Sequence, residues 1–210
     1  MNIYNVIILD ESGSMSSIYK ETLQSMNEVL GGIRKTQEDY PDQQHFVTFV
    51  TFEGHGIEGI KVRRDRVPIG TIQDITEKDY RPGGCTPLYD AMGNTLNELE
   101  GLVSENDRVM ATIITDGYEN SSTEYSGRTV KTLVERLRKK GWVFAYIGAN
   151  QDAVEVAKDL SISNALNYEA SPEGMVEMRF SLNRAHRKMS RGVAKEAGAA
   201  FFDHLFKDDD

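Results

Sequence analysis

Three short segments of the chain carry oxygen-bearing side chains of the kind that bind a hard metal ion. Asp10, Ser12 and Ser14 alternate along the first segment, Thr86 lies just after a pair of glycines in the second, and Asp116 precedes a glycine in the third. Their carboxylates and hydroxyls suit Mg²⁺, Mn²⁺ or Ca²⁺ and do not suit Zn²⁺ or copper. We therefore predict one divalent metal site, with Mg²⁺ as the expected ion and Mn²⁺ or Ca²⁺ as alternatives.

The strands that must position these segments are recognisable as apolar runs. Residues 3–9 and 108–115 are rich in β-branched and other apolar side chains, which is typical of central strands buried on both faces. Asp10 directly follows the first run and Asp116 the second. Since ligands bind outside the carboxyl ends of strands in α/β sheets, these side chains lie where a site is expected.

The rest of the chain alternates between strand-like and helix-like patterns, which predicts a mainly parallel sheet covered by helices. Further strands are expected at 45–53, 59–69, 142–147 and 165–168, the second of them at an edge because it is more polar. Helices are expected at 16–36, from about 88, and at 129–140, 153–160 and 172–191. We assign residues 1–191 to one domain and 192–210 to a tail, either weakly ordered or docked as a short helix.

The bulk composition narrows the classes of function. The chain has 210 residues, a net charge of −9 and a single cysteine. An acidic chain is a poor candidate for a broad grip on nucleic acid, and one cysteine excludes an internal disulfide. We find no signal-peptide pattern and no apolar run long enough to span a bilayer. These features favour a cytoplasmic protein that binds neither nucleic acid nor membrane.

Taken together, the three segments resemble a known metal site. Asp-Glu-Ser-Gly-Ser-Met at 10–15, Gly-Gly-Cys-Thr-Pro at 83–87 and Thr-Asp-Gly at 115–117 are similar to the metal-ion-dependent adhesion site (MIDAS) of von Willebrand factor A domains. The resemblance covers about residues 1–190. It implies a Rossmann-like three-layer α/β/α fold, with a mainly parallel sheet of about six strands and one antiparallel edge strand.

The same resemblance implies roles for the five motif residues. Ser12, Ser14 and Thr86 would contact the metal directly, and Asp10 and Asp116 would act directly or through water. One coordination position would be left for an Asp or Glu of a partner protein. Intracellular bacterial single-domain relatives often act as adaptors in stress-response operons of the tellurium-resistance type, beside AAA+ ATPases, kinases or phosphatases. The resemblance therefore implies a metal-dependent adaptor domain that is not an enzyme.

An enzymatic alternative is a Mg²⁺-dependent phosphohydrolase, because an oxygen-rich site at strand ends could polarise a phosphoryl group. The haloacid-dehalogenase pattern requires Asp-x-Asp, however, and position 12 is a serine. Sequence motifs for a serine nucleophile or a phosphate-binding loop are absent as well. Other relatives act in DNA-end binding or ubiquitin recognition, but their metal sites are usually degenerate.

Several polar residues near the motif have open assignments. Glu11, Glu119 and Asn120 could rim the site, hold a second metal or be solvated loop residues. Asp90 could support the site or interact with the dipole of its own helix. The histidines do not pair at metal-ligand spacing, and we interpret all of them as structural or surface residues: His45, His55, His186 and His204.

Overall fold

The computed structural model describes residues 1–207 and contains a six-stranded sheet with the order β3-β2-β1-β4-β5-β6. Neighbouring strands are parallel except for β2 and β3, which are antiparallel. The predicted mainly parallel sheet with one antiparallel edge strand is therefore confirmed. The strands are β1 (Asn2–Asp10), β2 (Gln44–Phe52), β3 (Ile60–Pro68), β4 (Arg108–Thr115), β5 (Val143–Ala149) and β6 (Asn164–Tyr168).

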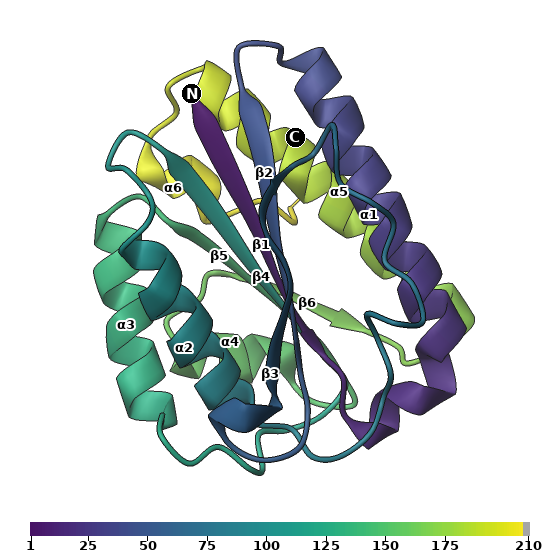
Figure 1. The fold of residues 1–210 in the computed structure, drawn as a ribbon. Coiled ribbons are helices and arrows are strands. Elements are labelled where there is room, and N and C mark those ends of the chain that lie inside the picture. The colour runs from purple at the N-terminus through teal and green to yellow at the C-terminus, as the bar shows by residue number, and fades with distance from the viewer. Residues whose placement is uncertain (208–210) are drawn as a thin grey trace.

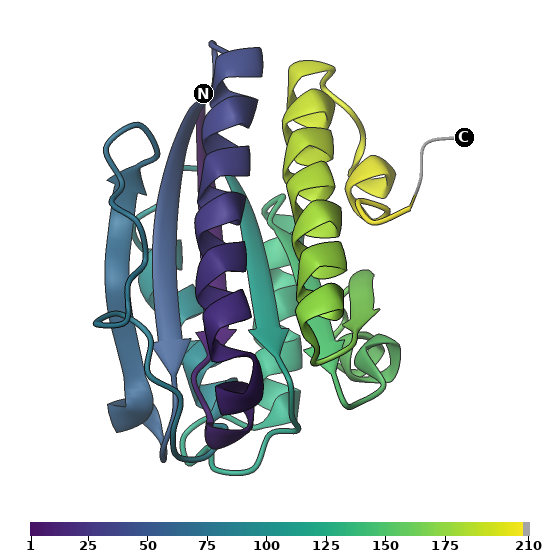
Figure 2. The ribbon, with the colours of Figure 1, turned by 90° about the vertical axis from the view of Figure 1, so that its right-hand side faces the viewer.

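Helices cover both faces of this sheet, which gives three layers (Figures 1 and 2). One face carries α1 (Tyr19–Asp39) and α5 (Pro172–Ala194), and the other carries α2 (Leu88–Glu100), α3 (Gly127–Lys139) and α4 (Ala153–Asp159). The short elements are the 3₁₀ helices η1 (Gly13–Ile18) and η2 (Ile57–Gly59) and the helix α6 (Ala199–Phe202). None of the helices within residues 1–207 combines the length and apolar character needed to cross a membrane.

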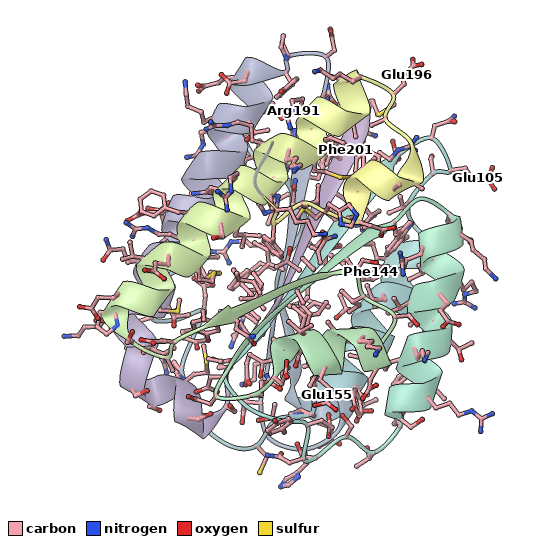
Figure 3. All side chains as sticks on the ribbon, turned by 180° about the vertical axis from the view of Figure 1, so that it is seen from behind. Glu105, Phe144, Glu155, Arg191, Glu196 and Phe201 are labelled. Carbon is pink, nitrogen blue, oxygen red and sulfur yellow. The ribbon has the colours of Figure 1, made fainter. Side chains whose placement is uncertain are left out.

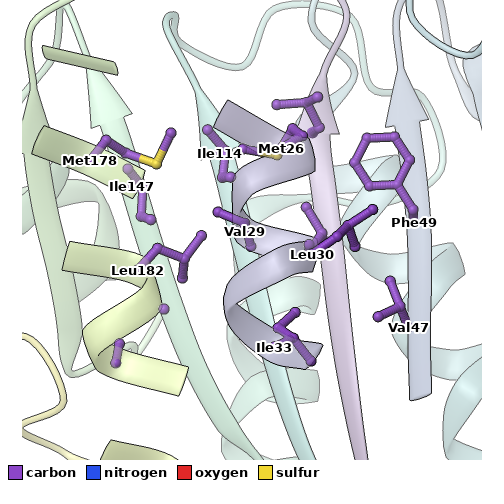
Figure 4. Packing of buried hydrophobic residues seen from close by; sticks show 14 of the residues in the cluster. Met26, Val29, Leu30, Ile33, Val47, Phe49, Ile114, Ile147, Met178 and Leu182 are labelled. Atoms are coloured by element: carbon purple, nitrogen blue, oxygen red, sulfur yellow. The ribbon is translucent and has the colours of Figure 1, made fainter. Parts of the chain in front are cut away.

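The alternation of side chains along β1 explains why the molecule has two cores. Ile7 and Leu9 belong to the cluster under α1 and α5, whereas Val6 and Ile8 belong to the cluster under α2, α3 and α4. All four side chains are fully buried, as expected of a central strand with helices on both sides. Figure 4 shows the first cluster, where apolar side chains of α1 and α5 pack against the strands.

Helix boundaries follow local sequence signals, with small departures from the predicted ones. Ser171 caps α5 by accepting a hydrogen bond from the Gly174 backbone, and Pro172 occupies the first turn as predicted. Pro87 precedes the first residue of α2 instead of opening the helix. The helix predicted from residue 16 begins as the 3₁₀ helix η1, and the α-helix α1 starts at Tyr19.

The segment after α5 packs on the domain up to the last described residue. The Leu205 side chain is fully buried, and Asp203 forms an ion pair with Arg138 at 2.7 Å. The ring of Phe201 lies against α5, where a Cβ added to Gly192 would come within 2.5 Å of it (Figure 3). Only glycine leaves room for this close approach. Residues 208–210 of the predicted tail lie outside the described residues.

Candidate metal centre

The first site segment follows the carboxyl end of β1 and curls around the Asp10 carboxylate. The fully buried Asp10 accepts a hydrogen bond from the Ser12 backbone at 2.7 Å through Oδ1. Its other oxygen, Oδ2, accepts one from the Thr115 hydroxyl of β4 at 2.6 Å. Asp10 therefore holds the first loop in its curled shape and ties it to the neighbouring strand.

Oxygen atoms from the first and third segments converge beside Asp10. The hydroxyls of Ser12 and Ser14 lie 3.1 Å apart, and Ser14 Oγ donates to Asp116 Oδ1 at 2.6 Å. Asp116 is almost fully buried, whereas Ser14 is exposed, so the group is reachable from solvent on the Ser14 side. Four of the five predicted ligands thus form one connected cluster at the carboxyl edge of the sheet.

Thr86 is brought to the same edge by its backbone. The Thr86 backbone amide donates to the side-chain oxygen Oδ1 of Asn120 at 2.9 Å, and the Thr86 carbonyl accepts from the backbone amide of Asn120 at 3.2 Å. The nearby Gly84 carbonyl accepts from the Gly13 amide at 3.1 Å, which joins the second segment to the first. Within residues 1–207, however, no hydrogen bond links the Thr86 hydroxyl to the other four residues.

The electrostatics of the cluster suit a cation. Burial raises the pKa of Asp10 to about 6, although the hydrogen bonds from Thr115 and Ser12 oppose the shift, and the nearby Asp116 adds to it. Burial also raises the pKa of Asp116, although the Ser14 hydroxyl opposes this shift. Two carboxylates withdrawn from water favour either a proton or a positive ion beside them.

The donor set fits Mg²⁺ or a similar hard ion, because it consists of oxygen atoms alone. Within the described part of the chain, no group of three or more His, Cys, Asp and Glu side chains is placed to hold a metal. The predicted site does not require such a group, since three of its five residues contribute hydroxyls.

The acidic residues that follow the motif support the loops and are not free to bind a second metal. Asp90 accepts hydrogen bonds from the backbone amides of Thr123, Glu124 and Tyr125, at 2.7 to 3.0 Å. The Glu119 carboxylate accepts four hydrogen bonds. The donors are the backbone amides of Tyr89, Ser121 and Ser122 and the Ser122 hydroxyl. The reading of Glu119 as a second-metal ligand or a solvated loop residue is therefore wrong.

The loop after β5 contributes two supporting residues that the sequence reading missed. Asn150 donates to the Asp116 carbonyl at 3.3 Å, and Gln151 donates to the Gly117 carbonyl at 3.2 Å. Asn150 has a φ of 55°, a left-handed conformation that asparagine tolerates better than most residues. An Asn-Gln pair directly after a strand at the same sheet edge was the available signal.

A comparison with known proteins identifies the family of this chain. A family model of the von Willebrand factor type A (VWA) domain matches residues 6–177. The chain therefore belongs to the von Willebrand factor type A family, whose domains commonly bind a divalent metal at a MIDAS and mediate protein interactions. No curated protein matches the chain significantly.

Solved structures share the fold at low sequence identity. The PilB minor pilin from Streptococcus sanguinis superposes with a TM-score of 0.68 at 11% identity, over 94% of this chain and 63% of that chain. Proximal thread matrix protein 1 from the mussel byssus, with a zinc-occupied MIDAS motif, gives 0.60 at 17% identity over 87% of this chain and 45% of that one. The SpRpn10 VWA domain superposes with a TM-score of 0.52 at 15% identity, over 85% of this chain and 93% of that chain. The chain spans less than half of the mussel protein.

Proposed function

We propose that this protein is a metal-dependent protein-interaction module that presents a Mg²⁺ ion to an acidic residue of a partner protein. Asp10, Ser12, Ser14, Thr86 and Asp116 would hold the ion, and its remaining position would accept an Asp or Glu. The observation that carries the proposal is the convergence of Ser12, Ser14 and Asp116 from two loops, within 3.1 and 2.6 Å of one another, on the solvent side of a buried Asp10.

The charges of the ligand set support binding of a partner carboxylate. Asp10 and Asp116 together balance the charge of a divalent ion, and the three hydroxyls add none. A bound Mg²⁺ would supply Lewis acidity, which attracts a further carboxylate oxygen. The protein's own residues hold the loops in register, exclude water from the Asp10 side and leave the Ser14 side exposed.

The geometry supports an interaction site better than a phosphohydrolase. The haloacid-dehalogenase pattern needs a second aspartate two residues after the first, whereas this position is Ser12, whose hydroxyl lies 3.1 Å from that of Ser14. The carboxylates of Glu119 and Asp90 are engaged by backbone amides, so neither is free to act as a general base. We therefore propose a protein that does not catalyse a reaction.

The wider assignment rests on the resemblance of the motif. We propose that the chain works in the cytoplasm as an adaptor in a stress-response assembly of the tellurium-resistance type. Its partner would be an AAA+ ATPase, a kinase or a phosphatase that presents an acidic residue. The metal in the cell would be Mg²⁺, while the zinc-occupied MIDAS of the mussel protein belongs to that protein.

Mn²⁺ binding, measured by electron paramagnetic resonance, tests the metal site. The wild type should bind one Mn²⁺ that Mg²⁺ displaces, and Asp116→Asn should abolish binding. Ser16→Ala is the matched control, because Ser16 is an exposed hydroxyl on the same 3₁₀ helix as Ser14. Wild-type protein that binds no Mn²⁺ at millimolar concentration would overturn the proposal.

A second measurement tests partner binding. An acidic peptide, acetyl-Gly-Asp-Gly-amide, should shift amide resonances of the Ser12–Ser14 loop only when Mg²⁺ is present. The asparagine version of the peptide is the control, because it keeps the shape and lacks the charge. Equal shifts with both peptides, or shifts that persist in EDTA, would contradict the role proposed for the open metal position.

A further inference from the structure

Glu11, the residue between Asp10 and Ser12, carries a fully buried carboxylate that is paired with arginine. Arg63 of β3 donates from Nη2 to both carboxylate oxygens, at 3.2 and 3.0 Å. Lys61 of the same strand lies 3.9 Å from Glu11 Oε2. A buried carboxylate is tolerated only when it is paired and hydrogen-bonded, and Glu11 satisfies both conditions.

The arginine is itself held in place on the edge strand. Arg63 Nε donates to the Thr51 hydroxyl of β2 at 2.9 Å. Lys61 also reaches Glu53 at 2.8 Å. The Arg63–Glu11 ion pair therefore attaches the loop after β1 to the antiparallel edge strand, and the bond to Thr51 holds Arg63 in place.

Glu11 also grips the segment that leads to Thr86. Its carboxylate accepts a hydrogen bond from the Arg81 amide, and its carbonyl accepts one from the Gly83 amide at 2.8 Å. On either side of these bonds, the Tyr80 hydroxyl donates to the Asp10 carbonyl at 3.0 Å, and the Gly13 amide donates to the Gly84 carbonyl at 3.1 Å. Two of these four links between the loop after β1 and residues 80–84 thus pass through Glu11.

The second segment also packs closely at Gly84. Gly84 has a φ of 66°, and a Cβ added there would lie 2.7 Å from the Gly54 amide nitrogen. The chain at Gly84 is therefore packed against the loop after β2 as closely as glycine allows. Thr86 lies three residues after Gly83, so the Glu11 bonds act on the stretch that leads directly to it.

From these contacts we infer that Glu11 is a positioning residue of the metal centre, which fixes the Thr86 segment against the loop of Asp10, Ser12 and Ser14. This inference rests on the proposed metal site. Arg63 neutralises the Glu11 charge, so the contribution to metal binding is geometric and adds no net charge near the ion. Residues that orient metal ligands commonly change metal affinity by about 10- to 100-fold when mutated.

Two double variants separate geometry from charge. Glu11→Gln/Arg63→Met removes the ion pair but keeps an oxygen for the Arg81 amide, and its Mn²⁺ affinity should stay close to that of the wild type. Glu11→Ala/Arg63→Met removes the acceptor as well, and its affinity should fall about 10-fold or more. Neither variant leaves a buried charge without a partner, and a thermal melt in EDTA checks that each is folded.

The variant Glu11→Asp keeps the charge and shortens the side chain by one methylene, so it remains informative if the alanine double variant does not fold. We expect the shorter side chain to lose either Arg63 or the Arg81 amide, and its Mn²⁺ affinity to fall about 10-fold. Unchanged affinity in Glu11→Asp, or in a folded Glu11→Ala/Arg63→Met, would overturn the positioning role. Absence of Mn²⁺ binding by the wild type would instead overturn the metal site itself.

Discussion

The two ends of the β1–β2 strand pair both contain buried polar side chains, but these are arranged in opposite ways. At the carboxyl end, Asp10 has hydrogen-bond partners for both oxygens and is connected to an exposed Ser14. Near the amino end, the buried His45 of β2 and His186 of α5 form a second polar cluster, which Ser190 of α5 joins through a 3.4 Å contact with His45. Both ring nitrogens of the buried His186 in that cluster lack partners among the described residues.

The difference lies in what can compensate the loss of water. Burial raises the pKa of Asp10 to about 6, and it lowers the pKa of His45 to about 4 and that of His186 to about 3. All three shifts favour the neutral form, as desolvation requires. The proposed metal ion would reach the first cluster through its exposed side and restore the charged form, whereas residues 1–207 offer no comparable access to the histidines. Perturbed titration alone does not mark a functional site; access for a ligand is needed as well.

The largest effect that would test this comparison is acid destabilisation through the histidines. Their folded pKa lies below the unfolded value of 6.5, so the unfolded chain takes up protons first as the pH falls. Stability is therefore full above about pH 6.5 and declines towards pH 4, by about 1.4 kcal/mol per pH unit for each histidine. Urea unfolding at pH 7 and pH 5 measures the loss.

His186→Met should remove the share of this loss that belongs to His186, because methionine fills much of the ring volume and does not titrate. His55→Met is the matched control, since His55 is exposed on a loop. If His186→Met and the wild type lost the same free energy of unfolding between pH 7 and pH 5, the description of the amino-end cluster as a neutral buried pair would be wrong.

A second effect of similar size concerns the metal end alone. At a Mg²⁺ concentration 100 times the dissociation constant, binding should stabilise the wild type by about 2.7 kcal/mol. Asp116→Asn should abolish that gain, and His186→Met should leave it intact. Thermal denaturation with Mg²⁺ and with EDTA measures both. If Mg²⁺ still stabilised Asp116→Asn, the ion would bind elsewhere than at the proposed site.

The metal affinity should itself depend on pH. Mg²⁺ and a proton compete for the Asp10 carboxylate, whose folded pKa is raised to about 6. Affinity should be constant above this pH and decrease by up to about tenfold for each unit below it. Mn²⁺ titrations at pH 7.5, 6.0 and 5.0 measure the decrease. A constant affinity across this range would mean that Asp10 does not contribute its charge to the ion.

A last pair of variants compares one hydrogen bond at each end. Thr115→Val removes the 2.6 Å bond to the Asp10 carboxylate and should cost about 1.5–3 kcal/mol at pH 8, where Asp10 is ionised. Ser190→Ala removes the 3.4 Å contact with the neutral His45 and should cost about 1 kcal/mol. Urea unfolding in EDTA measures both losses. The reverse order would contradict the contrast between a charged and a neutral cluster.

The sequence was informative where function depends on short segments. The apolar runs at 3–9 and 108–115 led directly to β1 and β4, and the side chains after them led to Asp10 and Asp116. These features are local, since a buried strand and the turn after it are both visible in neighbouring residues. Whether the five predicted residues hold a metal stays a prediction that the binding experiments test.

Contacts between distant segments could not be predicted in the same way. The Ser190–His45 contact joins residues 145 positions apart, and the Arg63–Glu11 pair depends on the register of β3 against β2. The sequence leaves Asp90 either supporting the site or interacting with the dipole of its own helix, and its partners, the amides at 123–125, are brought near only by the folded loop. Sequence patterns reveal which face of an element is buried and seldom reveal which polar groups meet there.

The bond between Ser14 and Asp116 has a consequence for the timing of folding during synthesis. It connects residues 102 positions apart, so the two halves of the site cannot meet until β4 has left the ribosome and docked beside β1. At about 5–20 residues per second, synthesis of the 102 residues from Ser14 to Asp116 alone takes about 5–20 s, and docking follows once β4 has left the ribosome. If the proposed site binds Mn²⁺, a nascent chain that binds the ion has already assembled the centre of its sheet, so Mn²⁺ binding would report this step of folding on the ribosome.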